Sequence, residues 1–179
     1  MGEKDYFVVT SNGEGHFELC GFDPSKSYEI EGNWFTMQCA RPCHDTLYSS
    51  LEVAEKLSAA EQGGHVPSQL VPRCPRCGGP MDIHMGAGQS MIPDTAAQAR
   101  FQNFLKTYHG KKLVVLELGI GWRNQLIKAP LMRLVASEPN ATYVTINLGE
   151  IADNIKEKSF GLDGRLDELL PALREACEA

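Results

Sequence analysis

The 179-residue sequence predicts an α/β protein: a partial, doubly wound parallel sheet with an inserted four-cysteine module. Two observations lead to this fold class. Short apolar runs typical of buried strands alternate with amphipathic segments of helical period, which is the pattern of parallel strands joined by helices. Four of the six cysteines form two close pairs in a stretch rich in Pro and Gly, and this stretch interrupts the alternation.

The first predicted strand is the apolar run Tyr6–Val9, which ends in a polar turn that contains Gly13. The next segment, "HFELCGF", is long enough for one or two helical turns. The alternating segment "SYEIEGNW" predicts a second strand that ends at Gly32. Further on, "LEVAEKLSAAEQ" predicts a short amphipathic helix that stops at the next two glycines.

The second half of the chain repeats the alternation of helices and strands. Asp94 or Thr95 can cap a helix over "TAAQARFQNFLKTYH", and Gly110 closes it. "KKLVVLELG" and "ATYVTINLGE" predict two strands, and a short last strand is expected near Phe160. "NQLIKAPLMRLVASEPN" predicts a helix that is interrupted or starts near Pro130, and "RLDELLPALREACE" predicts a terminal amphipathic helix despite Pro171. We therefore assign 1–34 and 94–179 to the sheet domain and 35–93 to the inserted module.

Composition narrows the function classes. The net charge of −6 and pI near 5.4 argue against general binding to nucleic acid or to anionic membranes, because the protein's field repels polyanions. The sequence has no apolar run of bilayer length, and "MGEKDYF" lacks the pattern of a signal peptide. These features predict a cytoplasmic chain, in which paired cysteines indicate a metal before a disulfide.

The cysteine spacing predicts a closed structural zinc site. Cys39 and Cys43 are separated by three residues, and Cys74 and Cys77 by two. Two such pairs on short turns can meet at one tetrahedral ion, which then has four thiolate ligands and no open position. The metal would fold the module and take no part in catalysis. Free thiols or redox-active dithiols are the alternative.

Two histidines and two further cysteines are not assigned to the zinc site. His44 and His84 are close in sequence to the pairs and either could replace a ligand, although both are expected at the surface. Cys20 and Cys177 stand alone and are expected to be ordinary thiols.

The chain resembles the sirtuins, and within them the microbial branch linked to macrodomains. The matching text is "FVVTSN", "GFDPSKSYEIEGNW", "QCARPCHDTLYSS", "LVPRCPRCGGPM", "LVVLELGIGWRNQLIKAP" and "NATYVTINLGE", in family order and with zinc spacing between. The resemblance implies a Rossmann-like, sirtuin-type sheet with an inserted zinc-ribbon module, and NAD as the cofactor.

Family roles transfer first to the end of the first strand. Thr10, Ser11 and Asn12 match the Thr-x-Asn motif beside the nicotinamide ribose, so the resemblance implies cofactor contact for all three and a catalytic role for Asn12. Glu31 occupies the position where most sirtuins carry a histidine that acts as general base, and the resembling branch also lacks that histidine. A carboxylate can accept a proton, so Glu31 is the second catalytic candidate. The alternatives are that Asn12 only stabilises the turn and that Glu31 is a solvated carboxylate at the end of the strand.

The resemblance also implies cofactor contacts in the second half of the chain. Gly119 and Gly121 match the family's Gly-Thr-Ser loop, whose amides suit phosphate or ribose oxygens at a helix start. Asn147 matches the family's "IN" motif at the adenosine ribose. The alternatives are a tight strand-to-helix turn for the glycines and a cap or turn for Asn147.

Sirtuins also have a strand that ends in a Gly-Ala-Gly-x-Ser loop before the Thr-x-Asn strand. No such segment precedes Asp5, so we expect the NAD-phosphate half of the site to come from elsewhere. A partner chain or a second copy could complete the sheet, the chain could be a fragment, or it could close its sheet differently. The literal match in Gly86–Ser90 is expected to be an irregular loop after the zinc knuckle.

Two functions follow as expectations. The first is a sirtuin-like, NAD-dependent protein ADP-ribosyltransferase or deacylase that acts on a protein substrate and needs the complementing half. The second is a non-catalytic, zinc-bearing module for protein–protein interaction. Loss of the histidine at Glu31 favours ADP-ribosyl transfer over deacetylation within the first.

Overall fold

The structure is a computed structural model that describes residues 4–86, 90–151 and 154–178. The chain divides into two compact units, Met1–Asn103 and Phe104–Ala179, which are described separately. No helix in the described ranges is long and apolar enough to cross a membrane.

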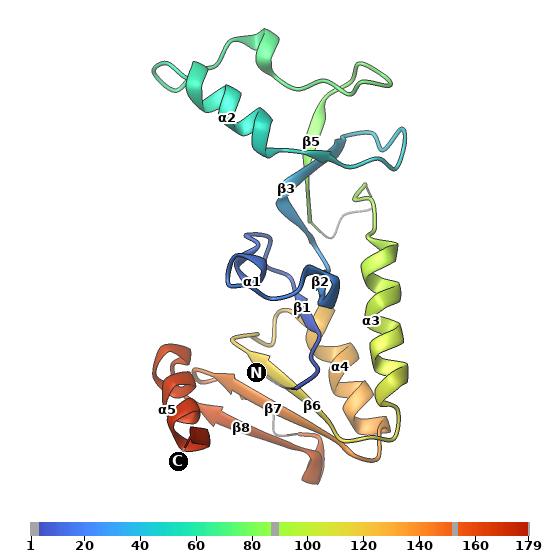
Figure 1. Ribbon diagram of the computed structural model, residues 1–179, viewed down its shortest axis with the longest axis vertical. Helices are drawn as coiled ribbons and strands as arrows, with labels where there is room; N and C mark the ends of the chain where they lie inside the picture. Colours follow the sequence, from blue (N-terminus) through green and yellow to red (C-terminus); the bar gives the residue numbers. More distant parts are fainter. Residues whose placement is uncertain (1–3, 87–89, 152–153, 179) are drawn as a thin grey trace. The chain divides into compact units, whose positions relative to one another are not determined.

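The N-terminal unit contains the first parallel strand pair. Strand β1 (Val8–Thr10) pairs in parallel with β2 (Ser27–Glu29), so that Thr10 lies opposite Glu29. The short helix α1 (His16–Leu19) and a 3-10 turn lie between them in the sequence (Figure 1). The predicted parallel arrangement of these two strands is confirmed.

The second strand ends earlier than predicted because the chain turns after Glu29. Gly32 has a φ of 75°, and a Cβ at this position would lie 2.1 Å from the carbonyl oxygen of His84. Only glycine tolerates both this backbone conformation and this close approach. A new strand, β3 (Gly32–Cys39), therefore starts at the residue where the sequence predicted the old one to end.

The inserted module is built on an antiparallel sheet in the order β4–β3–β5. Strand β4 (Tyr48–Ser49) leads into α2 (Leu51–Ala60), and β5 (Met81–Met85) returns along β3. Because β5 pairs with β3, it is a strand of the module and not a parallel neighbour of β1. Gly86 follows it directly, and residues 87–89 of the Gly-Ala-Gly segment lie outside the described residues.

Helix α3 (Thr95–Tyr108) begins where the sequence predicts. The Asp94 carboxylate accepts a hydrogen bond from the Ala97 amide at 2.8 Å, which is the predicted N-cap. Phe101 on this helix packs against Phe7 and Tyr28, with ring centroids 5.3 and 6.5 Å apart. These contacts attach the first half of α3 to the β1–β2 pair.

The C-terminal unit is a parallel three-stranded sheet in the order β6–β7–β8 (Figure 1). Its strands are β6 (Leu113–Leu118), β7 (Ala141–Asn147) and β8 (Ser159–Asp163), and its helices are α4 (Gln125–Ser137) and α5 (Leu166–Glu178). Val135 of α4 packs on Ala141 and Tyr143 of β7 to form the centre of this unit's core. The predicted strand and helix alternation is confirmed here.

A buried ion pair lies between β6 and α4. Lys128 Nζ is 2.6 Å from Glu117 Oε1, and both side chains are at most 1% exposed. The Tyr143 hydroxyl donates to the other Glu117 oxygen, and the Lys128 ammonium lies 4.6 Å from the centre of the Trp122 ring. Burial raises the pKa of Tyr143, and the Glu117 carboxylate raises it further.

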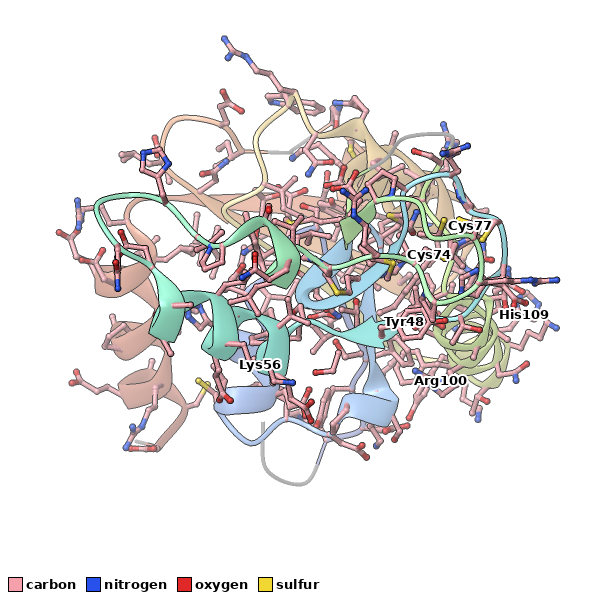
Figure 2. The ribbon with its side chains drawn as sticks, turned by 90° about the horizontal axis from the view of Figure 1, so that it is seen from above. Tyr48, Lys56, Cys74, Cys77, Arg100 and His109 are labelled. Carbon is pink, nitrogen blue, oxygen red and sulfur yellow. The ribbon has the colours of Figure 1, made fainter. Side chains whose placement is uncertain are left out.

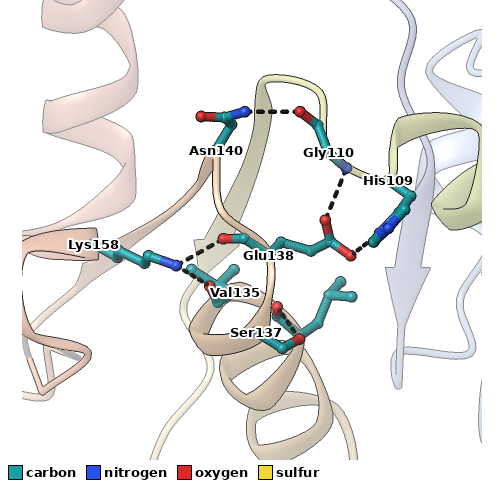
Figure 3. Close-up of polar contacts among 8 residues, drawn as sticks. His109, Gly110, Val135, Ser137, Glu138, Asn140 and Lys158 are labelled. Atoms are coloured by element: carbon teal, nitrogen blue, oxygen red, sulfur yellow. Dashed lines mark hydrogen bonds and ion pairs between the residues drawn. The ribbon is translucent and has the colours of Figure 1, made fainter.

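A second polar network closes the other end of the unit (Figure 3). Glu138, just after α4, accepts hydrogen bonds from the Gly110 amide at 3.0 Å and from His109 Nδ1 at 2.7 Å. Lys158 donates to the Glu138 carbonyl at 2.7 Å, and Asn140 donates to the Gly110 carbonyl at 2.7 Å. The network joins the ends of α3 and α4 to the segment before β8.

Candidate functional site

The four paired cysteines meet at one point of the inserted module. Their sulfur atoms all lie within 4.8 Å of one another, and Figure 2 shows Cys74 and Cys77 together in this region. The shortest contacts run between the two pairs: Cys39 Sγ is 3.6 Å from Cys77 Sγ, and Cys43 Sγ is 3.6 Å from Cys74 Sγ. The residues predicted from spacing are therefore brought together as predicted.

This geometry fits a tetrahedral ion. A zinc–sulfur bond of about 2.3 Å places tetrahedral ligands about 3.8 Å apart, which is close to the two shortest sulfur–sulfur distances. A disulfide requires about 2.05 Å, so the thiols are unbonded. Four sulfur donors at these separations satisfy the ligand number and the chemistry of a closed structural site.

The backbone stabilises the first cysteine of each pair as a thiolate. Hydrogen bonds from the Cys43 and Arg41 amides lower the pKa of the Cys39 thiol to about 6. Amides of Cys77 and Arg76 act in the same direction on Cys74, whose pKa is lowered despite opposing desolvation. These are the knuckle turns that metal-binding cysteine pairs form.

Cys43 has a different environment. Desolvation and the three neighbouring thiols raise the pKa of Cys43 to about 12 when no cation balances the cluster. Its sulfur lies 3.0 Å from His44 Nδ1, and His44 Nε2 lies 2.7 Å from the Tyr48 hydroxyl. His44 therefore lies beside the cluster and contacts its ligands, as its position in the sequence suggested.

The expectation that His84 is a surface residue is wrong. Its side chain is buried, with Nε2 2.6 Å from the Ile92 carbonyl oxygen and Nδ1 3.2 Å from Thr36 Oγ1. Its two nitrogens are used in holding β5 to β3 and to the segment before α3. Cys20 and Cys177, for which the sequence left burial open, are exposed thiols.

The end of β1 and the turn after β2 form a second group of candidate residues. The Ile30 amide donates to the Thr10 carbonyl at 2.9 Å, and the Trp34 amide donates to the Gly13 carbonyl at 2.9 Å. The segment that contains Ser11 and Asn12 thus runs beside the turn that contains Glu31. Asn12 is exposed. Its backbone amide donates a hydrogen bond to Thr10 Oγ1 at 3.0 Å, so Asn12 lies in a tight local turn.

Glu29 is an acidic residue of this region that the sequence analysis did not select. It lies opposite Thr10 in the parallel register, and Asn33 Nδ2 donates to its Oε2 at 2.5 Å. Burial raises the pKa of Glu29, and the nearby carboxylates of Glu14, Glu18 and Asp94 raise it further. The alternation of "SYEIEG" could not separate Glu29 from Glu31, because it did not show that the strand ends at Glu29 and that Glu31 lies in the turn after it.

In the C-terminal unit, the Gly119–Gly121 loop and Asn147 are brought together. Asn147 Nδ2 donates to the Ile120 carbonyl at 3.3 Å, and the Gly119 amide donates to the Ile146 carbonyl at 3.0 Å. Gly119 has a φ of 67°, which requires glycine in this strand-to-helix turn. Because its amide is already bonded, the predicted phosphate or ribose contacts cannot use that amide.

Glu150 lies against the same loop and was not selected from the sequence either. Its Oε2 accepts the Trp122 amide at 2.7 Å, and a Cβ on Gly121 would lie 2.8 Å from this oxygen. Asn147 ends β7 and Glu150 follows this strand, so both reach the loop from the carboxyl end of β7. In the sequence, Glu150 could have been selected only from its position three residues after the "IN" motif.

Comparison with known proteins gives two curated relatives, while no family model matches. A protein named protein ADP-ribosyltransferase from Staphylococcus aureus is 29% identical over 174 residues, which cover 93% of this chain and 55% of that protein. A probable bifunctional ADP-ribose hydrolase/ADP-ribosyltransferase from Fusarium oxysporum f. sp. cubense is 30% identical over 127 residues, covering 66% of this chain and 21% of the relative. The chain thus spans about half the length of the first relative.

Solved structures of sirtuins match nearly the whole chain. One, described as the structural basis for sirtuin substrate affinity, has a TM-score of 0.63 and 21% identity. Another, of Sir2Tm bound to a propionylated peptide, has a TM-score of 0.60 and 20% identity. Each match covers 96% of this chain and 64% of the sirtuin. The chain therefore has the sirtuin fold and is similar in sequence to two proteins that are named as ADP-ribosyltransferases.

Proposed function

We propose that this chain is part of an NAD-dependent protein ADP-ribosyltransferase. The observation that carries the proposal is the placement of Asn12 beside the Glu31 turn at the carboxyl ends of two parallel strands. Ligands of open α/β sheets bind at these ends. The similarity to a named ADP-ribosyltransferase over 93% of this chain supports the same conclusion.

The proposed roles follow from side-chain chemistry. NAD supplies the ADP-ribosyl group and loses nicotinamide as the leaving group. Asn12 orients the nicotinamide ribose or an attacking group through its amide, with Thr10 and Ser11 shaping the turn. Glu31 accepts a proton from the nucleophile or the ribose. Gly119 is proposed to shape the strand-to-helix turn, Gly121 to offer its amide to phosphate or ribose oxygens, and Asn147 to contact the adenosine ribose.

Glu29 is the competing proton acceptor within the same strand end. Its raised pKa brings a carboxyl group closer to neutral pH, where a general base works best, and Asn33 orients it. Deacylation is the second candidate reaction, supported by the sirtuin fold. ADP-ribosyl transfer is preferred because Glu31 stands where deacylating sirtuins carry their histidine.

We further propose that another polypeptide or a second copy supplies the strand that carries the NAD-phosphate loop. Among the described residues, β1 pairs only with β2 and β6 pairs only with β7, so each sheet has an edge strand. On β6, Val114 and Leu116 are 64% and 45% exposed, which is unusual for a strand of an α/β sheet. An added strand would satisfy the backbone of such an edge.

We propose zinc as the ion of the cysteine cluster and a cytoplasmic location, in which the thiols stay reduced. Zinc would hold the two knuckles together and leave the reaction to the residues near Asn12. A non-catalytic interaction module built on this zinc centre is the alternative function, favoured by Glu31 in place of the histidine.

Calorimetric titration with NAD separates the two functions. Micromolar binding by the chain alone refutes the interaction module, and binding that needs an added chain with a Gly-Ala-Gly-x-Ser loop supports the divided enzyme. No binding in either case, together with no transfer of ADP-ribose to protein, contradicts the enzyme.

Substitutions in a transfer assay then assign the residues. Asn12→Ala should lower turnover by at least about tenfold, and unchanged turnover would remove Asn12 from the site. Glu31→Gln and Glu29→Gln are compared in parallel, because only loss of the true base produces the 10²–10⁴-fold decrease expected for general base catalysis (order of magnitude). Glu52→Gln, at an exposed carboxylate on α2, is the control.

A further inference from the structure

The cysteine cluster has a neighbour that the zinc ligand set does not explain. His44 follows Cys43 directly, and its ring is held between two groups: Cys43 Sγ at 3.0 Å from Nδ1 and the Tyr48 hydroxyl at 2.7 Å from Nε2. Cys74 Sγ is 4.0 Å from the same Nδ1, so Cys43 is the nearer sulfur. Two hydrogen-bonding groups therefore orient the ring at both nitrogens.

The protonation of each group decides which atom donates in the two hydrogen bonds of His44. A metal-bound thiolate has no proton to donate, so His44 Nδ1 must carry the N–H that points at Cys43. Nε2 of the neutral ring is then an acceptor, and the Tyr48 O–H donates to it. The result is a directed chain of hydrogen bonds from Tyr48 through His44 to the sulfur.

Strand pairing holds Tyr48, the first donor in this series of hydrogen bonds, in place. It lies on β4, where Met37 of β3 is its register partner, and β3 continues to the ligand Cys39. The two rings pack edge to face with centroids 5.7 Å apart, which limits rotation of His44. The strand pairing that builds the module thus also sets the orientation of the imidazole.

Backbone amides serve two of the four cysteines, and the histidine ring serves a third. Cys39 accepts hydrogen bonds from the backbone amides of Arg41 and Cys43. Cys74 accepts hydrogen bonds from the backbone amides of Arg76 and Cys77. At Cys43, the hydrogen-bonding neighbour is the ring of His44. A divalent ion with four thiolates carries a net charge of −2, which N–H donors to sulfur disperse. Cys43 is also more exposed than Cys39 or Cys74, so its bond to the metal is open to attack.

We propose that Tyr48 and His44 form an outer-shell hydrogen-bond relay that positions Cys43 and stabilises its bond to the metal. His44 is a positioning residue here and not a fifth candidate ligand. The inference rests on the proposed metal centre, but not on the proposed reaction, and its test needs no turnover.

The test replaces the native metal of the full chain with Co²⁺ and follows the sulfur-to-cobalt charge-transfer bands. His44→Ala should retain four-thiolate binding, shift the bands to lower energy, and speed release of the ion to a chelator by about tenfold or more. His44→Asn, whose amide can reach the position of Nδ1, should recover part of both effects. Tyr48→Phe keeps the ring and the strand and should give a smaller change in the same direction.

Each outcome has one meaning. His65→Ala, at an exposed histidine of the same module, is the matched control and should behave as wild type. Bands and release rates that are unchanged in both His44→Ala and Tyr48→Phe overturn the relay while leaving the metal centre intact. Loss of a nitrogen ligand from the cobalt spectrum in His44→Ala also overturns it, because His44 would then be a direct ligand. A wild-type chain that takes up no cobalt overturns the metal centre and the relay together.

Discussion

Replacing Lys128 by Met should destabilise the C-terminal unit severely. Lys128 Nζ lies 2.6 Å from Glu117 Oε1, and neither side chain is more than 1% exposed. At an effective dielectric constant of about 20, two unit charges at this distance attract by about 6 kcal/mol. Desolvation of both ions offsets most of that attraction, so the intact pair adds little net stability.

Breaking the pair removes the attraction but leaves the desolvated carboxylate. Among the described residues, Glu117 then keeps the Tyr143 hydroxyl as a partner, and an uncompensated buried charge costs about 3–5 kcal/mol. Met retains the length and apolar stem of Lys, so little of the loss comes from packing. Replacing Glu117 by Leu and Tyr143 by Phe together with Lys128→Met should recover most of the lost stability.

The assay is urea unfolding followed by tryptophan fluorescence. In a Trp34→Phe background, Trp122 is the remaining tryptophan and lies 4.6 Å from Lys128, so it reports on this unit. A loss of about 4 kcal/mol lowers the urea midpoint by roughly 2 M when the slope is about 2 kcal/mol/M. Arg174→Met is the control in the same unit, because the Arg174–Glu178 pair is 78% and 64% exposed and should contribute little. A loss below about 1 kcal/mol in Lys128→Met would refute the reasoning.

Three further predictions test other parts of the structure. Gly64→Ala should lower the free energy of unfolding by about 1–2 kcal/mol, because the backbone at Gly64 is left-handed. Gly32→Ala should lower it by about 1–3 kcal/mol more, because the added Cβ meets the His84 carbonyl. Equal losses of stability in thermal unfolding would contradict the tight approach at Gly32. Glu138 accepts the Gly110 amide and contacts His109, which lowers its pKa, so its contribution to stability is present above pH 4.5 and lost as pH falls through the lowered value. Wild type and Glu138→Gln should therefore differ in unfolding midpoint at pH 7 and converge once the pH falls below the lowered pKa, and a constant difference would refute this account. Metal analysis should find one ion per chain, and chelation or Cys74→Ser should unfold the 35–93 module, as followed by circular dichroism; a stable, metal-free native module would rule out the structural metal.

The candidate sites were predictable to different degrees. The four cysteines could be assigned from spacing, since each pair needs only a short local turn to present two sulfurs. Asn12 and Glu31 could be grouped only through the family resemblance, because they are 19 positions apart and only strand pairing brings their two segments side by side. Glu29 and Glu150 escaped selection, because burial of one and the position of the other beside a loop depend on contacts distant in sequence.

By itself, the sequence determined the α/β class, the alternation of helices and strands in the second half of the chain and the four cysteines that cluster, because these depend on local periodicity, caps and short spacings. Tertiary structure decided that β2 ends before Gly32, that β5 belongs to the metal module, and that Lys128 pairs with Glu117. It also placed His44 between Cys43 and Tyr48. Close approach of backbones, desolvation of charges and the orientation of a ring are set by neighbours far along the chain, and local pattern carries no record of them.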